Sequence, residues 1–162
     1  MSNGKQQALQ DIAFVNNHKV EMLFYPDAWK KAKNSVCQWV KEPFPPKPRS
    51  KIPKLAGVYI FVVEPNIFNL SQANGLFYVG KAKNLYNRVG SYISELSTDF
   101  NKTQRPHIWR MLNQWHGNLG YYYTTTMNVA IAEELETEMI NAYIPPFNRS
   151  FNAEISQVTR AF

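Results

Sequence analysis

One carboxylate in the last third of the chain, that of Glu136, falls where the sequence pattern calls for an apolar side chain. The surrounding residues predict a helix, and spacings of four place Ala132, Glu136 and Ile140 on the same face. An unpaired carboxylate on a packed face is costly, so Glu136 requires a cation, a hydrogen-bond donor or a metal ion. The pattern is compatible with a salt bridge to Lys81 or Arg88 and with a bound divalent metal.

A second set of polar side chains, Asn84, Arg88 and Tyr92, recurs every four residues. This spacing places them on one face of a predicted helix, beside the apolar stripe that contains Leu85 and Val89. An arginine at such an edge can be an ordinary surface residue, or it can bind a phosphate group. Because two tyrosine-containing strands are predicted directly upstream, phosphate binding is the favoured interpretation.

The elements that would position these residues follow in the order strand, strand, helix, helix, strand, helix. Runs of β-branched and aromatic residues predict three strands, at residues 57–63, 76–80 and 121–126. Apolar residues at helical spacing predict three helices, at residues 84–93, 108–115 and 130–143. The sequence therefore predicts an α+β fold, sandwich-like, with a small three-stranded antiparallel sheet flanked by helices.

The first 43 residues are predicted to form a helical extension. One helix is expected at about residues 5–15, and a second begins with Asp27 as its N-cap and continues through Trp39 and Val40. The proline-rich stretch 42–54 interrupts all helix and predicts an extended, stiff linker. Its four basic side chains either lie along a phosphate backbone or only keep the linker soluble.

The charge balance favours a polyanionic partner. The 162 residues include 18 Lys and Arg against 12 Asp and Glu, which gives a net charge of +6 and a pI near 9.4. Nucleic acid is the usual partner of such a protein. Acidic residues gather at 133–138 while most basic residues lie upstream, as expected if cations hold phosphates and a carboxylate holds a metal.

Several classes of protein are disfavoured by the composition. Cys37 is the single cysteine, so an intrachain disulfide and a cysteine-rich metal site are excluded. His18, His107 and His116 lack the spacing of a zinc site. The sequence has no apolar run of membrane-spanning length and no signal-peptide core at its N-terminus. A reducing, cytoplasmic setting without membrane contact is therefore predicted.

Two tripeptides, at residues 57–59 (GVY) and 78–80 (YVG), resemble the paired motifs that name the GIY-YIG nuclease superfamily. Each tripeptide alone is unspecific, but the run from 78 to 92 and the closing segment around 135–148 extend the resemblance. Within the superfamily the chain is most similar to the N-terminal nuclease domain of bacterial excision-repair incision subunits of the UvrABC type. The 18 residues between Tyr59 and Tyr78 exceed the usual number, which predicts a longer hairpin loop at 64–75.

The extent of this resemblance, about residues 53–149, also divides the chain. It implies an N-terminal helical extension with its basic linker at 1–52, a GIY-YIG nuclease domain at 53–149 and a C-terminal tail at 150–162. The whole set of residues expected for catalysis is present in the central part.

The resemblance implies hydrolysis of a DNA phosphodiester by an activated water. Tyr59 and Tyr78 would flank the scissile phosphate, and one of them would help to deprotonate or orient the water. A phenol has a pKa of about 10 and is a poor base at neutral pH, so Lys81 would stabilise its anion or relay the proton. Arg88 would neutralise charge that develops on the phosphoryl oxygens.

By the same resemblance, Glu136 would hold one divalent cation, which stabilises the departing 3′ oxygen. A single protein carboxylate suits Mg²⁺, with Mn²⁺ as a substitute, because Mg²⁺ retains several waters. Tyr92 and Asn148 also match family positions and are expected to orient and support the others. Asn148 could equally be a turn residue that ends the last helix.

The expected partner is DNA, whether duplex, branched or single-stranded. Basic residues predicted to contact it are Lys47, Arg49, Lys51, Lys54, Lys83, Lys102, Arg105 and Arg110. A sequence-specific restriction or homing enzyme would act as a homodimer, whereas a structure-specific repair nuclease would act as a monomer. The alternative is a catalytically inactive nucleic-acid-binding module of the same fold.

Overall fold

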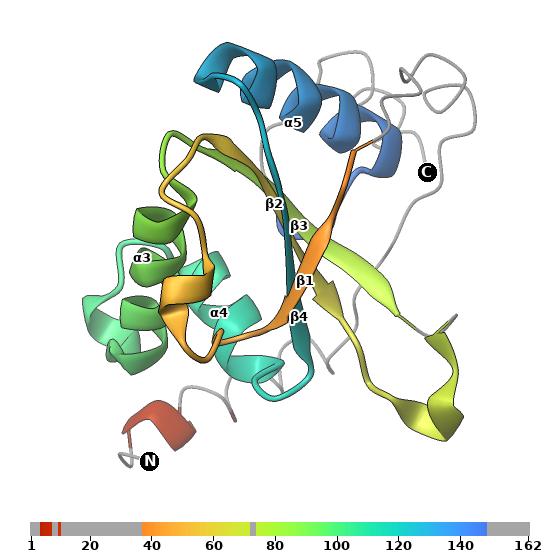
Figure 1. The fold of residues 1–162 in the computed structure, drawn as a ribbon. Helices are drawn as coiled ribbons and strands as arrows, with labels where there is room; N and C mark the ends of the chain where they lie inside the picture. The colour runs from red at the N-terminus through yellow and green to blue at the C-terminus, as the bar shows by residue number, and fades with distance from the viewer. Residues whose placement is uncertain (1–3, 8–9, 11–36, 72–73, 149–162) are drawn as a thin grey trace, which may run out of the picture.

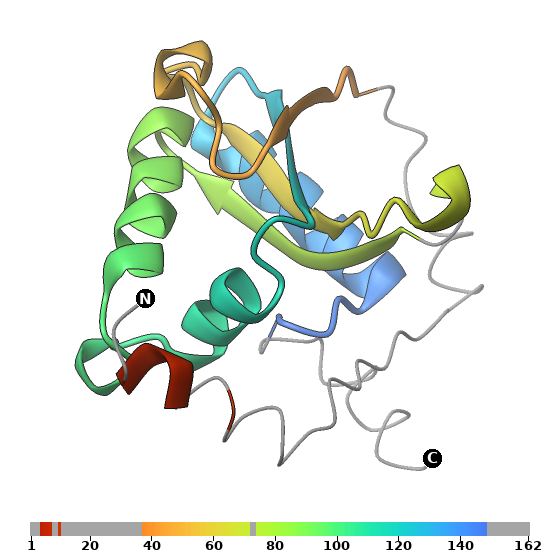
Figure 2. The same cartoon turned by 90° about the horizontal axis from the view of Figure 1, so that it is seen from below.

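In the computed structural model, which describes residues 4–7, 10, 37–71 and 74–148, one antiparallel sheet separates two layers of helices (Figures 1 and 2). Its strands are β1 (Val40–Pro43), β2 (Gly57–Val63), β3 (Gly75–Ala82) and β4 (Leu119–Thr125), in the spatial order β1-β4-β2-β3. The α-helices after β1 are α3 (Leu85–Ser97), α4 (Pro106–Gln114) and α5 (Val129–Tyr143). Three 3-10 turns connect them, η1 (Arg49–Lys51), η2 (Ile67–Asn69) and η4 (Phe100–Lys102).

The two faces of the sheet follow from the alternation of side chains along a strand. On β2, Val58 and Ile60 pack with the apolar residues of α5, whereas Tyr59 and Phe61 join a core with α3 and α4. Figure 2 shows α3 and α4 on one side of the sheet and α5 on the other. Neighbouring residues of β2 therefore reach opposite layers, and a site that uses both layers must lie around an edge of the sheet.

The predicted α+β class with an antiparallel sheet is confirmed, but the sheet has four strands rather than three. The additional strand, β1, pairs with β4 through Val40 opposite Tyr123, so the predicted helix does not extend to Val40. Without β1, the backbone groups along the outer edge of β4 would lack strand partners. Residues 37–39 of that predicted helix are described and are not helical, whereas its residues 27–36 lie outside the described residues. Of the helix expected at 5–15, residues 5–7 and 10 are described and are helical, and the others lie outside the described residues.

The proline-rich stretch packs on the sheet and is not a free extended linker. Phe44 and Ile52 are buried in the core on the α3 side, and the Phe44 N–H donates to the Leu119 carbonyl at 2.9 Å. The hairpin loop between β2 and β3 contains η2, whose Phe68 side chain is exposed. The predicted domain boundaries, after residues 52 and 149, remain predictions. Within the described residues, no helix has the length and apolar character needed to cross a membrane.

Candidate active site

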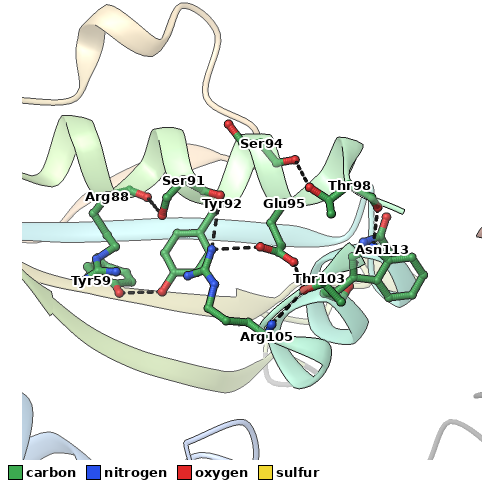
Figure 3. Close-up of polar contacts among 11 residues, drawn as sticks. Tyr59, Arg88, Ser91, Tyr92, Ser94, Glu95, Thr98, Thr103, Arg105 and Asn113 are labelled. Carbon is green, nitrogen blue, oxygen red and sulfur yellow. Dashed lines mark hydrogen bonds and ion pairs between the residues drawn. The ribbon is translucent and has the colours of Figure 1, made fainter. Parts of the chain in front are cut away.

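Three tyrosines from three different elements meet on the α3 side of the sheet. The Tyr59 hydroxyl, on β2, lies 2.7 Å from the Tyr92 hydroxyl on α3 (Figure 3). Tyr78, on β3, has its ring centroid 6.2 Å from that of Tyr59 and 6.5 Å from that of Tyr92. Asn84 begins α3 by accepting a hydrogen bond from the Asn87 N–H, and this start places Tyr92 two turns later. The structure therefore brings together the three tyrosines that the sequence predicted.

Steric crowding explains why glycine occupies its position in each of the two tripeptides. A Cβ added at Gly80 would lie 2.3 Å from the Tyr59 hydroxyl oxygen, because that ring crosses directly over the glycine of β3. A Cβ added at Gly57 would lie 2.2 Å from the Thr124 carbonyl oxygen of β4. Both distances are far below contact distance, so each glycine admits a neighbour that any larger residue would displace.

Two of the tyrosines, Tyr59 and Tyr92, are deeply buried, and this burial changes the pKa values of their hydroxyl groups. Burial raises the pKa of Tyr59 well above its ordinary value, and the nearby Tyr92 and Tyr78 raise it further, while Arg88 opposes the shift. Burial likewise raises the pKa of Tyr92. Both phenols therefore remain protonated at neutral pH and act as hydrogen-bonding groups. Tyr78 is only half-buried, and its ring stands at the edge strand.

The Arg88 side chain extends from α3 toward Tyr59 (Figure 3). Burial opposes its charge, but Tyr59, Tyr92, Tyr78 and Glu136 outweigh that effect, so its pKa is raised. One guanidinium thus acts electrostatically on all three tyrosines and on the carboxylate of α5. Within the described part of the chain, Arg88 forms no ion pair, which leaves its donors available to an anionic ligand.

Glu136 contacts the edge strand from the other face. Its Oε1 accepts a hydrogen bond from the Lys81 backbone N–H at 3.0 Å, and its Oε2 lies 3.4 Å from Lys81 Nζ. That ammonium has a shorter contact, 2.6 Å, with Glu133 Oε1. The hydrogen bond to Glu133, and then the charge of Glu136, raise the pKa of Lys81 despite partial desolvation. The salt bridge to Lys81 that the sequence allowed is therefore present.

Asn148 holds the same edge strand at the residue between Tyr78 and Gly80. Its Oδ1 accepts from the Val79 N–H at 2.9 Å, and its Nδ2 donates to the Val79 carbonyl at 2.8 Å. Together with the bond to Lys81, these contacts satisfy outward-facing backbone groups of β3. The Asn148 side chain therefore fixes the strand that carries Tyr78.

The donor set fits a magnesium ion better than a metal that needs several protein ligands. Among the described residues, no group of three His, Cys, Asp or Glu side chains could surround a metal. Glu136 offers one partly exposed carboxylate, whose Oε2 lies 3.4 Å from Lys81 Nζ. Mg²⁺ is often held by one or two carboxylates together with waters and substrate phosphates.

The eight basic residues predicted to contact DNA differ in their surroundings. Lys54, Lys83 and Arg88 line a depression of about 600 Å³ at the start of α3, together with Asn84 and other polar residues. Lys47 is exposed, and in the described part of the chain neither it nor Lys54 nor Lys83 forms an ion pair. Lys54 has a cation–π contact with Tyr86, its Nζ lying 5.4 Å from the ring centroid. The depression thus gathers three cations that form no ion pair with the described residues.

The other five basic residues contact polar groups of the protein itself. Arg49 donates to the Tyr86 carbonyl at 2.9 Å, and its guanidinium lies 3.8 Å from the Tyr86 ring centroid. The remaining four partners are Glu42 for Lys51, Asp99 for Lys102, Glu95 for Arg105 and Gln114 for Arg110.

Sequence reasoning missed Glu95, a buried acid one turn after Tyr92. It receives hydrogen bonds from Arg105 and from the Thr103 hydroxyl (Figure 3). The signal was available, because an acid three residues after Tyr92 lies on the same side of the helix. It was not distinguished from the solvated acids of the chain.

Comparisons with known proteins support one family. A model of UvrC-like GIY-YIG domains matches residues 55–149. The UvrABC system protein C of Syntrophotalea carbinolica is 35% identical over 99 residues, which are 61% of this chain and 14% of that protein. A crystal structure of the GIY-YIG N-terminal endonuclease domain of UvrC from Thermotoga maritima, bound to magnesium, is 27% identical. That match covers 64% of this chain and 93% of the other, with a TM-score of 0.45.

Proposed function

Since the chain belongs to the family of UvrC-like GIY-YIG domains, we propose that it is a metal-dependent DNA endonuclease that hydrolyses phosphodiester bonds with an activated water. The observation that supports this most directly is the position of Arg88, which extends from α3 toward Tyr59 (Figure 3) and lines the same depression as Lys54 and Lys83. A phosphate beside that guanidinium would have phenols on one side and a carboxylate on the other. Such a site suits phosphoryl chemistry.

Among the tyrosines, Tyr78 is the one that we propose contacts the attacking water. Tyr59 is 1% exposed and its hydroxyl already pairs with Tyr92, whereas Tyr78 is half-buried at the edge strand. Tyr59 would then orient its neighbours and the phosphate rather than meet the water. Lys81, on the same strand, carries a protonated ammonium, whose positive charge would stabilise the phenolate that forms.

Glu136 would hold the divalent cation, which when bound supplies Lewis-acid stabilisation of the departing oxygen. The contacts of Lys81 allow this. Its ammonium lies closer to Glu133 than to Glu136, so Lys81 can keep Glu133 as partner when Glu136 Oε2 binds a cation. The hydrogen bond from the Lys81 N–H would keep Glu136 Oε1 in place meanwhile.

We assign DNA binding to the depression lined by Lys54, Lys83 and Arg88, where a phosphate backbone would meet three cations that form no ion pair with the described residues. Duplex, branched and single-stranded DNA share this chemistry. Restriction or homing cleavage by a homodimer and structure-specific repair by a monomer are both included in the proposal. A reducing, cytoplasmic setting agrees with the single cysteine.

The proposal is tested by incubating the purified protein with supercoiled plasmid, single-stranded circle and branched DNA, in Mg²⁺, Mn²⁺ or EDTA. We expect cation-dependent cleavage that Glu136→Gln abolishes. The preferred substrate and the mass of the active species in light scattering then separate the restriction-type from the repair-type enzyme.

One observation favours the alternative, a non-catalytic binding module. Glu136 already has partners in Lys81, as a purely structural residue would. If the wild-type protein binds DNA but cuts no substrate with either cation, this alternative replaces the nuclease.

A further inference from the structure

We propose that Arg105 is a positioning residue for the Tyr59–Tyr92 pair, and that the buried carboxylate of Glu95 holds Arg105 in place. The importance of this arrangement for cleavage rests on the proposed nuclease function, whereas the arrangement itself can be tested without activity. It assigns Arg105 to the interior support of the site, although the sequence placed it among the DNA contacts.

The anchor of the arrangement is Glu95, which is 8% exposed. Arg105 Nη2 donates to Glu95 Oε2 at 3.1 Å, and the Thr103 hydroxyl donates to Glu95 Oε1. The backbone N–H of Arg105 donates in turn to Thr103 Oγ1 at 2.9 Å. These contacts close a ring between α3 and the residues that precede α4 (Figure 3). Arg105 therefore has both its main chain and its side chain fixed.

The fixed guanidinium lies against Tyr92. Arg105 Cζ is 5.2 Å from the Tyr92 ring centroid, within the range of a cation–π contact. Arg105 Nη2 also approaches the carbonyl of Ser91, the residue before Tyr92, at 3.5 Å. At its far end the Tyr92 ring carries the hydroxyl that bonds Tyr59 at 2.7 Å. A displacement of this ring would move that hydroxyl, so Arg105 controls the position of Tyr59 through Tyr92.

Binding DNA with Arg105 would undo these contacts. The Arg105 side chain is 32% exposed, while that of Glu95 is 10% exposed. Moving the guanidinium to a phosphate would leave the Glu95 carboxylate buried without its cation, which is strongly unfavourable. Lys102, three residues earlier, is 78% exposed and is under no such restriction.

The chain offers a matched control on the other face of the sheet. Lys41 Nζ lies 2.9 Å from Glu64 Oε1, and Glu64 is also 8% exposed. The Lys41 ammonium lies 5.5 Å from the Tyr122 ring centroid, and the Tyr122 hydroxyl donates to Glu64. This is a second cluster of cation, buried acid and tyrosine, but Tyr122 packs on the α5 side, away from Tyr59. Lys41→Ala therefore reproduces the loss of the cation without touching the proposed support.

The experiment compares Arg105→Ala, Arg105→Lys and Lys41→Ala in the full chain labelled with carbon-13 at the tyrosine Cζ. We expect the Tyr59 resonance to shift and broaden in Arg105→Ala, to recover partly in Arg105→Lys, and to stay unchanged in Lys41→Ala. With Mg²⁺ and DNA, Arg105→Ala should lower kcat about ten- to hundredfold at nearly constant KM. A DNA-contact role would instead raise KM and leave the Tyr59 resonance in place, and that result would overturn the proposal.

A double-mutant cycle with Tyr92→Phe provides the sharpest test, because this variant keeps the ring and removes the hydroxyl. If Arg105 acts through that hydroxyl, Arg105→Ala should cost little further activity in the Tyr92→Phe background. Additive losses would contradict the proposed route. Should Arg105→Ala fail to fold, Glu95→Gln keeps the shape of the anchor and is expected to give the same resonance shift, smaller in size. An unchanged Tyr59 resonance in Glu95→Gln and Arg105→Lys would reject positioning, whereas inactive wild-type protein would reject only the nuclease.

Discussion

Glu136 Oε1 and the backbone N–H of Lys81 are joined by a hydrogen bond of 3.0 Å, which ties α5 to the outer edge of β3. The edge of a sheet presents unpaired backbone groups, so this carboxylate stabilises the fold whatever else it binds. A residue with both a structural and a proposed catalytic task needs two substitutions to separate them.

We expect Glu136→Gln to abolish cleavage at little cost in stability. The amide oxygen can still accept from the Lys81 N–H, but it offers a weaker ligand for a divalent cation. Glu136→Ala removes both contacts and should lower the free energy of unfolding by a further ~1–3 kcal/mol. Urea denaturation and plasmid cleavage measure the two effects.

The control for both Glu136 variants is Glu134→Gln, an exposed acid on the same helix. It should change neither stability nor cleavage. Equal activity of Glu136→Gln and the wild-type protein would refute the metal-ligand role.

The sequence predicted local elements well because their signals are local. The predicted strand at 57–63 coincides with β2, and Asn84 caps α3 as expected. The sequence did not predict β1, because its four residues are too few to show an alternation of apolar and polar side chains and its partner, β4, is distant along the chain. At the site, the tripeptides identified Tyr59 and Tyr78, whereas the contact of Arg105 with Glu95 depends on how α3 packs against the residues that lead into α4, which no local pattern predicts. Charge alone does not reveal which cations are already paired.

The buried tyrosines predict a transition at alkaline pH. Burial raises the pKa values of Tyr59, Tyr92 and Tyr121 in the folded protein. Below pH 10, folded and unfolded chains both keep these protons, so the stability is fully present. Above it the unfolded chain loses protons first, and the free energy of unfolding falls by about 1.4 kcal/mol per pH unit for each tyrosine. Tyrosinate absorbance from these residues should therefore appear together with the loss of circular dichroism, and ionisation of all tyrosines in a native spectrum would contradict this.

Removing the hydroxyl from two stacked tyrosines should have opposite effects. The Tyr121 hydroxyl is buried without a hydrogen-bond partner among the described residues, and its ring stacks on Tyr59 with centroids 5.7 Å apart. Tyr121→Phe should stabilise the protein by about 1 kcal/mol, since a buried unsatisfied group is removed and the stack remains. Tyr59→Phe removes the hydrogen bond between Tyr59 and Tyr92 and should destabilise by about 0.5–1.5 kcal/mol. Denaturation of the two variants side by side measures their free energies of unfolding. Equal losses in the two variants would show that the Tyr121 hydroxyl has a hydrogen-bond partner.

The salt dependence of DNA binding should locate the phosphate contacts. Lys54→Ala and Lys83→Ala are each expected to reduce the slope of log K against log salt by about one, because each removes one released counterion. Arg49→Ala should instead lower stability, since the Arg49 guanidinium donates to the Tyr86 carbonyl and stacks on its ring. Fluorescence anisotropy at several salt concentrations measures the slopes. If Arg49→Ala reduces this slope while Lys54→Ala and Lys83→Ala do not, the phosphate contact lies at Arg49 in the proline-rich stretch and not in the depression.

The crossing of Tyr59 over Gly80 gives a prediction that connects packing with activity. An added Cβ would lie 2.3 Å from the Tyr59 hydroxyl oxygen and 2.9 Å from Tyr78 Cε1, so Gly80→Ala must displace a fully buried ring. Such overpacking should cost about 1–3 kcal/mol and lower cleavage, because the Tyr59–Tyr92 hydrogen bond cannot keep its geometry. Gly4→Ala, where a Cβ meets nothing within 4 Å, is the control.

A second substitution tests whether the Tyr59 ring, and not some other neighbour, excludes a side chain at Gly80. In a Tyr59→Leu background, which removes the atoms nearest to the added Cβ, Gly80→Ala should cost less than about 0.5 kcal/mol more, since the two sites are coupled only through that contact. An undiminished cost in this background would mean that the backbone of β3, or the Tyr78 ring, sets the requirement for glycine. The reduced cost that we expect would establish that the glycine of the second tripeptide is there to admit the tyrosine of the first.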